Sequence, residues 1–224
     1  MKKTKYIFLS YLLNEELTAF ADGKRLEIDE VSKISSGDSS NNTEIHLPTH
    51  FGTHIDFPYH FSDNGKKVET YPADYFVFDH VQFVDIQDRI NDNDIININH
   101  FNNIYFNPEA ELLLVKTGYY EFRNQKKYWN ENPAFHSDLA IYLKDHLPKL
   151  RTIGFDTISL SSWNKRTLGR EAHKTFLIEN DILLIEDMDL SELDSTSKFE
   201  KVIVAPLRVS GLEGAPVTVL AEIN

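Results

Sequence analysis

One eleven-residue segment constrains this chain more than any other, because it combines metal-binding residue types with a regular alternation. From position 50 to position 60 the sequence is His-Phe-Gly-Thr-His-Ile-Asp-Phe-Pro-Tyr-His. Its residues of metal-ligand type all occupy even positions: His50, His54, Asp56 and His60. Side chains of an extended strand alternate between two faces, so these residues would share one face. The segment therefore predicts a strand or near-extended loop with one coordinating face.

The odd positions of the same segment favour packing on the opposite face. They are apolar or aromatic at Phe51, Ile55, Phe57 and Tyr59. On the polar face, Gly52 has no side chain, and we expect it to leave room for an ion between His50 and His54. A helix with two histidines four residues apart is the alternative. Gly52 and Pro58 oppose it, and no glutamate follows His50.

The chain contains no cysteine, so a bound metal would be held by histidine and carboxylate side chains. Imidazole nitrogen with carboxylate oxygen suits Zn²⁺, Mn²⁺ or Fe²⁺ better than Ca²⁺ or Mg²⁺. Asp56 has two oxygens and can bridge a pair of ions, an arrangement that acidifies a shared water and favours hydrolysis.

One strand cannot surround two ions, so further ligands must come from elsewhere in the chain. His173 in an expected helix and Glu186 at the end of an apolar run are the candidates. The other histidines lack neighbours of ligand type, and we expect them to be ordinary residues: His46, His80, His100, His136 and His146. Of these, His46 lies four residues before His50 and has the same parity as the polar residues of the segment.

Charge and hydropathy exclude several classes of partner. The formal net charge of -12 argues against binding to the phosphates of nucleic acid or to an anionic membrane surface. No apolar run approaches the roughly 20 residues that span a bilayer. The apolar stretch at residues 6–9 is too short for a signal peptide. The absence of cysteine fits a cytoplasmic protein.

Local patterns predict strands joined by two helices. Apolar and β-branched runs predict strands at residues 6–13, 75–86, 111–116, 152–155, 182–185, 201–209 and 217–223. Helical spacing predicts helices at residues 133–150, with Ser137 as N-cap, and at residues 170–179. The polar residues 14–42 are expected to be irregular. Together these elements predict one mixed α/β or α+β domain over residues 1–224.

Residues 50–60 resemble the signature HxGTHxDxPxH of the cyclase family, which includes bacterial kynurenine formamidases and isatin hydrolases. The resemblance extends over nearly the whole chain. It includes Leu9-Ser10-Tyr11, Gly65, Tyr71-Pro72, Lys116-Thr117-Gly118, Gly154-Phe155-Asp156, residues 170–174, Ile185-Glu186-Asp187 and residues 214–217. It implies a swivelling β/β/α fold and a homodimer or homotetramer.

The resemblance also implies roles for individual residues. In the first ion site it places His50 and His54, and it makes Asp56 a bridge between both ions. For the second site it implies His173, with Glu186 as the second bridging carboxylate. His60 matches the proton donor and acceptor. The implied cofactor is Zn²⁺, as one or two ions, with Mn²⁺ as the alternative.

The implied activity is hydrolysis of a small-molecule amide at its C–N acyl bond, with a metal-activated water and His60 as general acid and base. Other reactions remain open at the same site: hydrolysis of a lactone or another cyclic compound, dehydration or ring closure. A non-catalytic member that binds a ligand through the metal is a further alternative. A serine nucleophile is disfavoured, because the chain lacks a Gly-x-Ser-x-Gly turn.

The chain departs from the formamidases near its N-terminus. They carry a tryptophan there that helps to bind the aromatic substrate, and their common Thr-Pro is Thr18-Ala19 here. Both tryptophans of this chain, Trp129 and Trp163, lie far along the sequence. Phe20 is the candidate replacement.

Overall fold

A computed structural model describes residues 4–224, and within that range nine strands form one mixed sheet. The order across the sheet is β5 (Val77–Phe78), β12 (Phe199–Pro206), β13 (Gly214–Ile223), β4 (His54–Asp56), β11 (Leu183–Glu186), β10 (Thr152–Phe155), β8 (Leu112–Lys116) and β6 (Val81–Asp85). Strand β1 (Lys5–Phe8) also pairs with β13, antiparallel to it.

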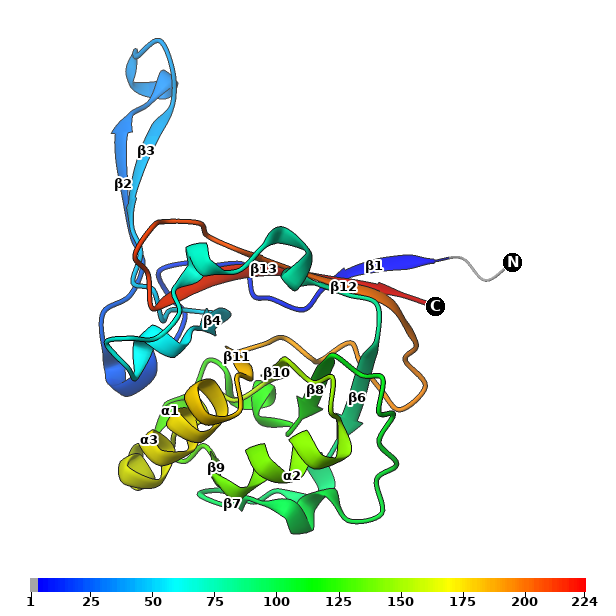
Figure 1. The fold of residues 1–224 in the computed structure, drawn as a ribbon. Helices are drawn as coiled ribbons and strands as arrows, with labels where there is room; N and C mark the ends of the chain where they lie inside the picture. Colours follow the sequence, from blue (N-terminus) through cyan, green and yellow to red (C-terminus); the bar gives the residue numbers. More distant parts are fainter. Residues whose placement is uncertain (1–3) are drawn as a thin grey trace.

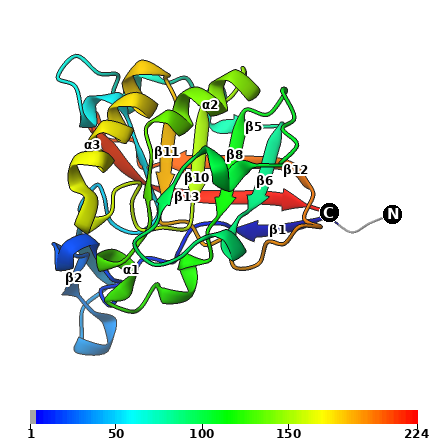
Figure 2. The same ribbon diagram turned by 90° about the horizontal axis from the view of Figure 1, so that it is seen from below.

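The sheet has a parallel half and an antiparallel half. Strands β6, β8, β10 and β11 are parallel to one another, whereas β1, β5, β12 and β13 pair antiparallel. Strand β4 connects the halves, because it pairs antiparallel with both β11 and β13. In Figure 2 the strands of the two halves cross at a steep angle.

Over residues 4–224 the chain also forms three α-helices: α1 (Lys127–Asn130), α2 (Asp138–His146) and α3 (Arg166–Lys174). Helices α2 and α3 cover the face of the parallel strands that lies away from β12 and β13 (Figure 1). The layers are therefore antiparallel strands, parallel strands and helices, which confirms the predicted mixed fold with β/β/α layers. Within the described residues, no helix has both the length and the apolar character needed to cross a membrane.

The buried strands follow their hydrophobic runs. All residues of β8, β10 and β11 are buried, as expected for parallel strands covered on both faces. On the helical side, Leu139 and Leu143 of α2 and Ala172 of α3 are fully buried in the same core. The predicted strands 111–116, 152–155 and 182–185 are confirmed to within a residue, because continuous apolar runs need no distant partner to be recognised.

Two of the longer predictions were wrong in detail. Residues 75–86 do not form one strand: a break at residues 79–80 separates β5, which pairs with β12, from β6, which pairs with β8. Residues 133–150 begin with a short strand, β9 (Ala134–Phe135), which pairs with β7 (Ile95–Ile96). Helix α2 follows from Asp138 with Ser137 at the predicted N-cap position, although the Ser137 hydroxyl donates to Glu171 and not to the helix backbone.

Helix α3 starts at Arg166, four residues before the predicted helix, and continues as a π-helical turn over Thr175–Glu179. Strands β12 and β13 lie within a few residues of their predicted ranges. Single 3-10 turns occur at Phe20–Asp22, Ile34–Ser36, Pro58–His60, Val68–Thr70, Ala73–Phe76, Gln87–Arg89, Ile98–Phe101, Tyr119–Phe122 and Trp163–Lys165.

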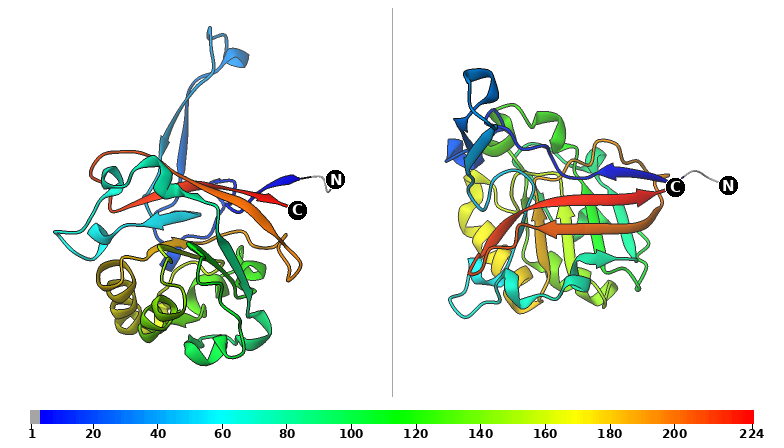
Figure 3. Two further views of the ribbon diagram at one scale, coloured as in Figure 1. Left: turned by 45° about the vertical axis from the view of Figure 1, so that its right-hand side comes forward. Right: turned by 90° about the horizontal axis from the view of Figure 1, so that it is seen from above.

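The N-terminal region differs most from expectation. Strand β1 ends at Phe8, although a strand was predicted as far as residue 13. Within residues 9–13, Ser10 forms an isolated β-bridge to Met188. The residues expected to be irregular contain strand β2 (Glu27–Ser32), which pairs with β3 (Asn42–His46). This hairpin projects from the body of the protein (Figures 1 and 3) and is almost entirely exposed. The sequence did not predict this hairpin, because its strands are held by backbone pairing and are mostly polar. They therefore show no apolar alternation.

Candidate metal centre and pocket

The segment at residues 50–60 gathers its polar side chains without being a continuous strand. Only His54–Asp56 forms strand β4; residues 50–53 turn, and Pro58–His60 form a 3-10 turn. The predicted packing face is confirmed at three positions, where the side chains are buried: Phe51, Ile55 and Phe57. Tyr59 is only partly buried and lies beneath the Lys67 ammonium group.

The role predicted for Gly52 was wrong. Its φ of 66° lies in the left-handed region, and a Cβ there would lie 2.1 Å from the Leu13 Cδ2 atom. Glycine is needed for the backbone turn and for the close approach of Leu13, not as space for an ion.

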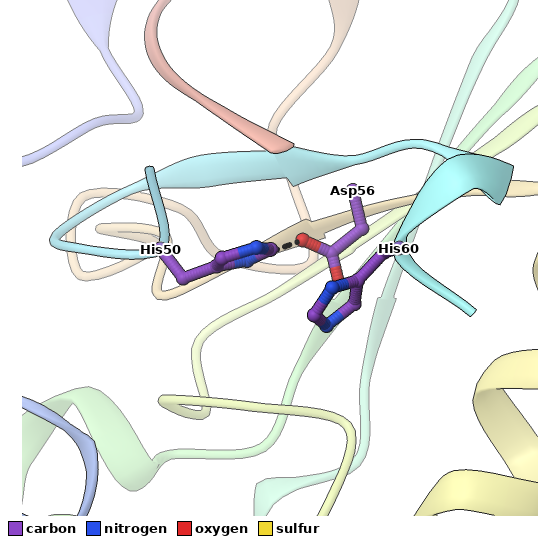
Figure 4. Close-up of side chains that lie close together, drawn as sticks. All are labelled: His50, Asp56 and His60. Carbon is purple, nitrogen blue, oxygen red and sulfur yellow. Dashed lines mark ion pairs between the residues drawn. The ribbon is translucent and has the colours of Figure 1, made fainter. Parts of the chain in front are cut away.

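Asp56 lies at the centre of the cluster. Its Oδ1 atom is 3.0 Å from His50 Nδ1 and 3.5 Å from His54 Nε2, while Oδ2 is 3.7 Å from His173 Nε2. The imidazoles of His50 and His60 both point toward this carboxylate (Figure 4). One buried carboxylate therefore contacts histidines from β4, its preceding turn and α3.

Glu186 closes the cluster from the neighbouring strand. Its Oε2 atom lies 3.4 Å from His54 Nε2, and its Oε1 atom lies 3.3 Å from His173 Nε2. The Oε1 atom also accepts a hydrogen bond from the Leu160 amide at 2.6 Å. The structure thus brings together all six residues predicted from the sequence, from the turn at residues 50–53, β4, the 3-10 turn at Pro58–His60, α3 and β11.

The side chains form two groups suited to a cation. The first is His50, Asp56 and His60, and the second is His54, Asp56 and Glu186; within each, one ligand atom per residue lies within 4.8 Å of the others. Asp56 belongs to both groups. The excluded histidines belong to neither group within residues 4–224: His46, His80, His100, His136 and His146.

The unpaired atoms at this centre fit a bound metal. His54 Nε2 and both Asp56 carboxylate oxygens are buried and have no partner with hydrogen-bond geometry among residues 4–224, although His50 Nδ1 lies 3.0 Å from Asp56 Oδ1. Leaving a buried polar atom unsatisfied costs about 1–3 kcal/mol, and more when the group is charged. A cation between these atoms would compensate that cost, and the nitrogen and oxygen donors suit Zn²⁺ or Mn²⁺.

Hydrogen bonds orient two of the imidazoles for coordination. The Nδ1 atoms of His54 and His173 lie 2.8 Å from the carbonyl oxygens of Gly52 and Gly169, respectively. A carbonyl oxygen only accepts, so each Nδ1 donates, and each Nε2 is the ring nitrogen left to bind a cation when the imidazole is neutral. Such outer hydrogen bonds are the usual way in which proteins fix a metal-binding histidine.

His50 is supported by two residues that sequence reasoning missed. Its Nε2 atom lies 3.3 Å from Glu213 Oε1, which also accepts from the Thr49 hydroxyl. A Cβ on Gly214 would lie 2.5 Å from His50 Cε1, so glycine is required for the imidazole to occupy this position. Glu213 carries no spacing signal, because it reaches His50 only through the pairing of β13 with β4.

The mutual charges of the cluster shift its titrations. Burial lowers the pKa of His54, but Glu186 and Asp56 outweigh it and raise the pKa to about 9. Burial would raise the pKa of Asp56, yet the surrounding histidines hold it well below its usual range. For His60, burial together with His50 and His173 keeps the pKa below its usual value.

A buried network lies directly behind Glu186. The Asp187 carboxylate accepts from Arg123 at 2.7 Å and from the Tyr128 hydroxyl at 2.6 Å. The Thr53 hydroxyl donates to the Asp187 carbonyl, which ties the residue before His54 to the residue after Glu186. Asp187 has a φ of 56°, so this network holds a strained backbone position next to a candidate ligand.

The cluster opens into a cavity of about 350 Å³. Phe20, Phe61 and Ile158 supply apolar lining, so Phe20 lies at the candidate pocket as expected. Trp163 is distant in sequence but packs edge-on against Phe20, with ring centroids 6.0 Å apart. Two arginines of α3, Arg166 and Arg170, also line the cavity and were not expected.

Comparison with known proteins agrees with the geometry. A family model described as "Putative cyclase" matches residues 7–162. Kynurenine formamidases from Bacillus cereus and Bacillus anthracis are 27% and 28% identical, and each alignment covers 97% of both chains.

Solved structures of isatin hydrolases have the same fold. Isatin hydrolase A from Labrenzia aggregata, bound to benzyl benzoate, superposes with a TM-score of 0.82 at 20% identity over 98% of this chain and 94% of that one. Isatin hydrolase A from Ralstonia solanacearum gives 0.79 at 16% identity, over 99% and 92%. With the family model covering most of the chain, this protein belongs to the cyclase family.

Proposed function

We propose that this protein is a metal-dependent hydrolase that cleaves the C–N acyl bond of a small-molecule amide, in the manner of an arylformamidase. The observation that carries the proposal is the pair of ligand groups that share the buried carboxylate of Asp56. The kynurenine formamidase relatives support the same chemistry. We extend the proposal to the whole chain, residues 1–224, acting as one domain.

The proposed metal ligands are His50, His54, Asp56, His173 and Glu186. One or two Zn²⁺ ions are the expected cofactor, with Mn²⁺ as the alternative. When bound, the metal would polarise the substrate carbonyl and acidify a water molecule. The buried carboxylates of Asp56 and Glu186 would neutralise the cation, while the carbonyls of Gly52 and Gly169 keep His54 and His173 oriented.

His60 is the proposed proton carrier. It lines the cavity, is only partly buried, and its ring centroid lies 4.2 Å from that of His50 and 6.1 Å from that of His173. From this position it can take a proton from the attacking water and deliver it to the leaving nitrogen. Its place in one ligand group makes coordination the competing role, which metal analysis of a His60 variant distinguishes.

The decisive experiment combines metal analysis with a substrate panel. Protein purified without added metal is analysed for its elements, then stripped with a chelator and reloaded with Zn²⁺ or Mn²⁺. We expect hydrolysis of formylated anilines to disappear on stripping and to return on reloading. A protein that contains no metal and regains none would contradict the proposal.

The same panel tests the other chemistries. Turnover of isatin or of lactones in place of formanilides would assign a ring-opening hydrolase to this site. A fully metal-loaded protein that turns over no compound in the panel would favour a ligand-binding role. We further expect a cytoplasmic protein that forms a homodimer or homotetramer. Light scattering of the purified protein measures the oligomeric state.

A further inference from the structure

One side of the cavity carries two positive charges that the proposed reaction leaves unexplained. Arg166 and Arg170 of α3 line the same cavity as His60 and Glu186. Within residues 4–224, neither guanidinium group has an ion pair or hydrogen bond to another residue. In a chain with a formal net charge of -12, acidic partners are abundant, so two unpaired arginines at one opening are unusual.

Local helix energetics disfavour these two residues. They are four residues apart, a spacing at which like charges repel on a helix surface. Arg166 is also the first residue of α3, where Lys165 is the N-cap and the first turn has no acidic residue. Cations at a helix N-terminus oppose the helix dipole. Residues that violate two local rules together indicate a function that compensates for the cost.

Aromatic residues hold Arg166 at the opening. Its guanidinium carbon lies 5.0 Å from the centroid of the Trp163 ring, a cation–π contact. Trp163 in turn packs edge-on against Trp129 and Phe20, at centroid distances of 5.5 and 6.0 Å. The charge of Arg166 is therefore connected through the Trp163 ring to Phe20, which forms part of the apolar wall of the cavity.

Arg170 places its positive charge near the candidate metal ligands in the cavity. It precedes His173 by three residues on α3, so both side chains leave the same face of the helix. A group bound by Arg170 would therefore lie about one helical turn from the Glu186–His173 pair. The cavity volume of about 350 Å³ suits a single-ring compound.

From these contacts, and resting on the proposed function, we propose that Arg166 and Arg170 select substrates with a carboxylate close to the hydrolysed acyl group. The aromatic body of the substrate packs against Phe20, Phe61 and Ile158, and its carboxylate accepts hydrogen bonds from the guanidinium groups. An aromatic amide with the carboxylate ortho to the amide nitrogen has this arrangement. The guanidinium groups bind the substrate and take no part in bond cleavage.

The test compares 2-formamidobenzoate, 4-formamidobenzoate and uncharged formanilide as substrates of the metal-loaded protein. We expect kcat/KM for the ortho compound to exceed that for formanilide by roughly 10-fold or more, with the para compound between them. In Arg166→Gln and Arg170→Gln this ratio should fall toward one. Arg208→Gln is the matched control, since Arg208 lies outside the cavity and its loss changes the net charge equally.

A binding measurement separates this inference from the proposed function. Calorimetry with 2-aminobenzoate should give a Kd that weakens roughly 10-fold in Arg170→Gln but not in Arg208→Gln, with unchanged metal content. Such binding without hydrolysis of any formanilide would overturn the function and retain the inference. Equal kcat/KM for all three substrates, with 2-aminobenzoate binding insensitive to both arginine variants, would overturn the inference and retain the function.

Discussion

His54 and Glu186 are directly opposite each other in the antiparallel pairing of β4 with β11, with His54 Nε2 3.4 Å from Glu186 Oε2. The same strand pairs on its other side with β13, where Gly214 is opposite Asp56. The candidate metal centre therefore lies where the parallel and antiparallel halves of the sheet meet. Its geometry depends on strand register, because a shift of one residue would turn these side chains to the other face.

The His60→Ala variant tests proton transfer apart from metal binding. We expect metal content close to that of the wild type and a fall in kcat of roughly 100-fold or more, since general acid–base catalysis contributes on this scale. Elemental analysis and steady-state kinetics on the same preparation measure both. Loss of the metal would instead make His60 a ligand, in the group that it forms with His50 and Asp56.

The Glu213→Gln variant tests support of His50 from outside the ligand groups. A neutral amide accepts the imidazole N–H less strongly than the carboxylate that lies 3.3 Å from Nε2. We expect metal affinity to fall roughly 10- to 100-fold, the range found for outer partners of metal ligands. Competition against a chromogenic chelator measures the change. An unaltered affinity would mean that Glu213 does not orient His50.

The Gly214→Ala variant tests the space that His50 occupies. A Cβ would lie 2.5 Å from His50 Cε1, so the imidazole must move away from Asp56. Because His50 is partly exposed, its side chain can shift at low cost to the fold. We expect the free energy of unfolding of the metal-free protein to change by less than about 1 kcal/mol, while metal affinity decreases. A variant that binds metal as tightly as the wild type would contradict the proposed role of His50.

The Arg123→Met variant tests the network behind Glu186. It leaves the buried Asp187 carboxylate without its 2.7 Å ion pair, and breaking a buried pair from one side costs about 3–5 kcal/mol. Urea denaturation of the metal-free protein measures the loss. Lys149→Met is the control, because it breaks an exposed pair with Glu109 and should cost at most about 1 kcal/mol. Similar losses of unfolding free energy in both variants would show that the buried Arg123–Asp187 pair stabilises the fold no more than an exposed pair does.

Asp156 gives the fold a pH dependence that is independent of the metal centre. Burial outweighs the hydrogen bonds from Thr117 and Gly118 and raises the pKa of Asp156 from 3.8 to about 6. A raised pKa means that the folded state holds the proton more tightly, so this contribution is complete below pH 3.8 and is lost as the pH rises through about 6. The loss amounts to about 3 kcal/mol.

The difference in unfolding free energy between the wild type and Asp156→Asn isolates this contribution, since other titrating groups cancel. We expect that difference, wild type minus variant, to decrease by about 2 kcal/mol between pH 4 and pH 7 in urea titrations, because part of the loss occurs already below pH 4. A difference that stays constant over this range would show that the pKa of Asp156 is not raised.

The sequence by itself determined the features that depend on residues close together in the chain. The apolar runs of β8, β10 and β11 identify buried strands, because burial on both faces requires continuous hydrophobicity. The alternation from His50 to His60 separated polar from packing side chains, although only His54–Asp56 is a strand. His173 and Glu186 have little signal in their own surroundings, and the resemblance to the family strengthened them as candidates.

The tertiary structure decided what depends on contacts between distant segments. The β2–β3 hairpin rests on backbone pairing, and the break between β5 and β6 reflects pairing with different halves of the sheet. Glu213 reaches His50, and Arg166 reaches the cavity, only through the packing of β13 and α3 around the site. Sequence spacing records chemistry within one segment, whereas register and helix packing determine which segments meet, and the candidate metal centre needs both.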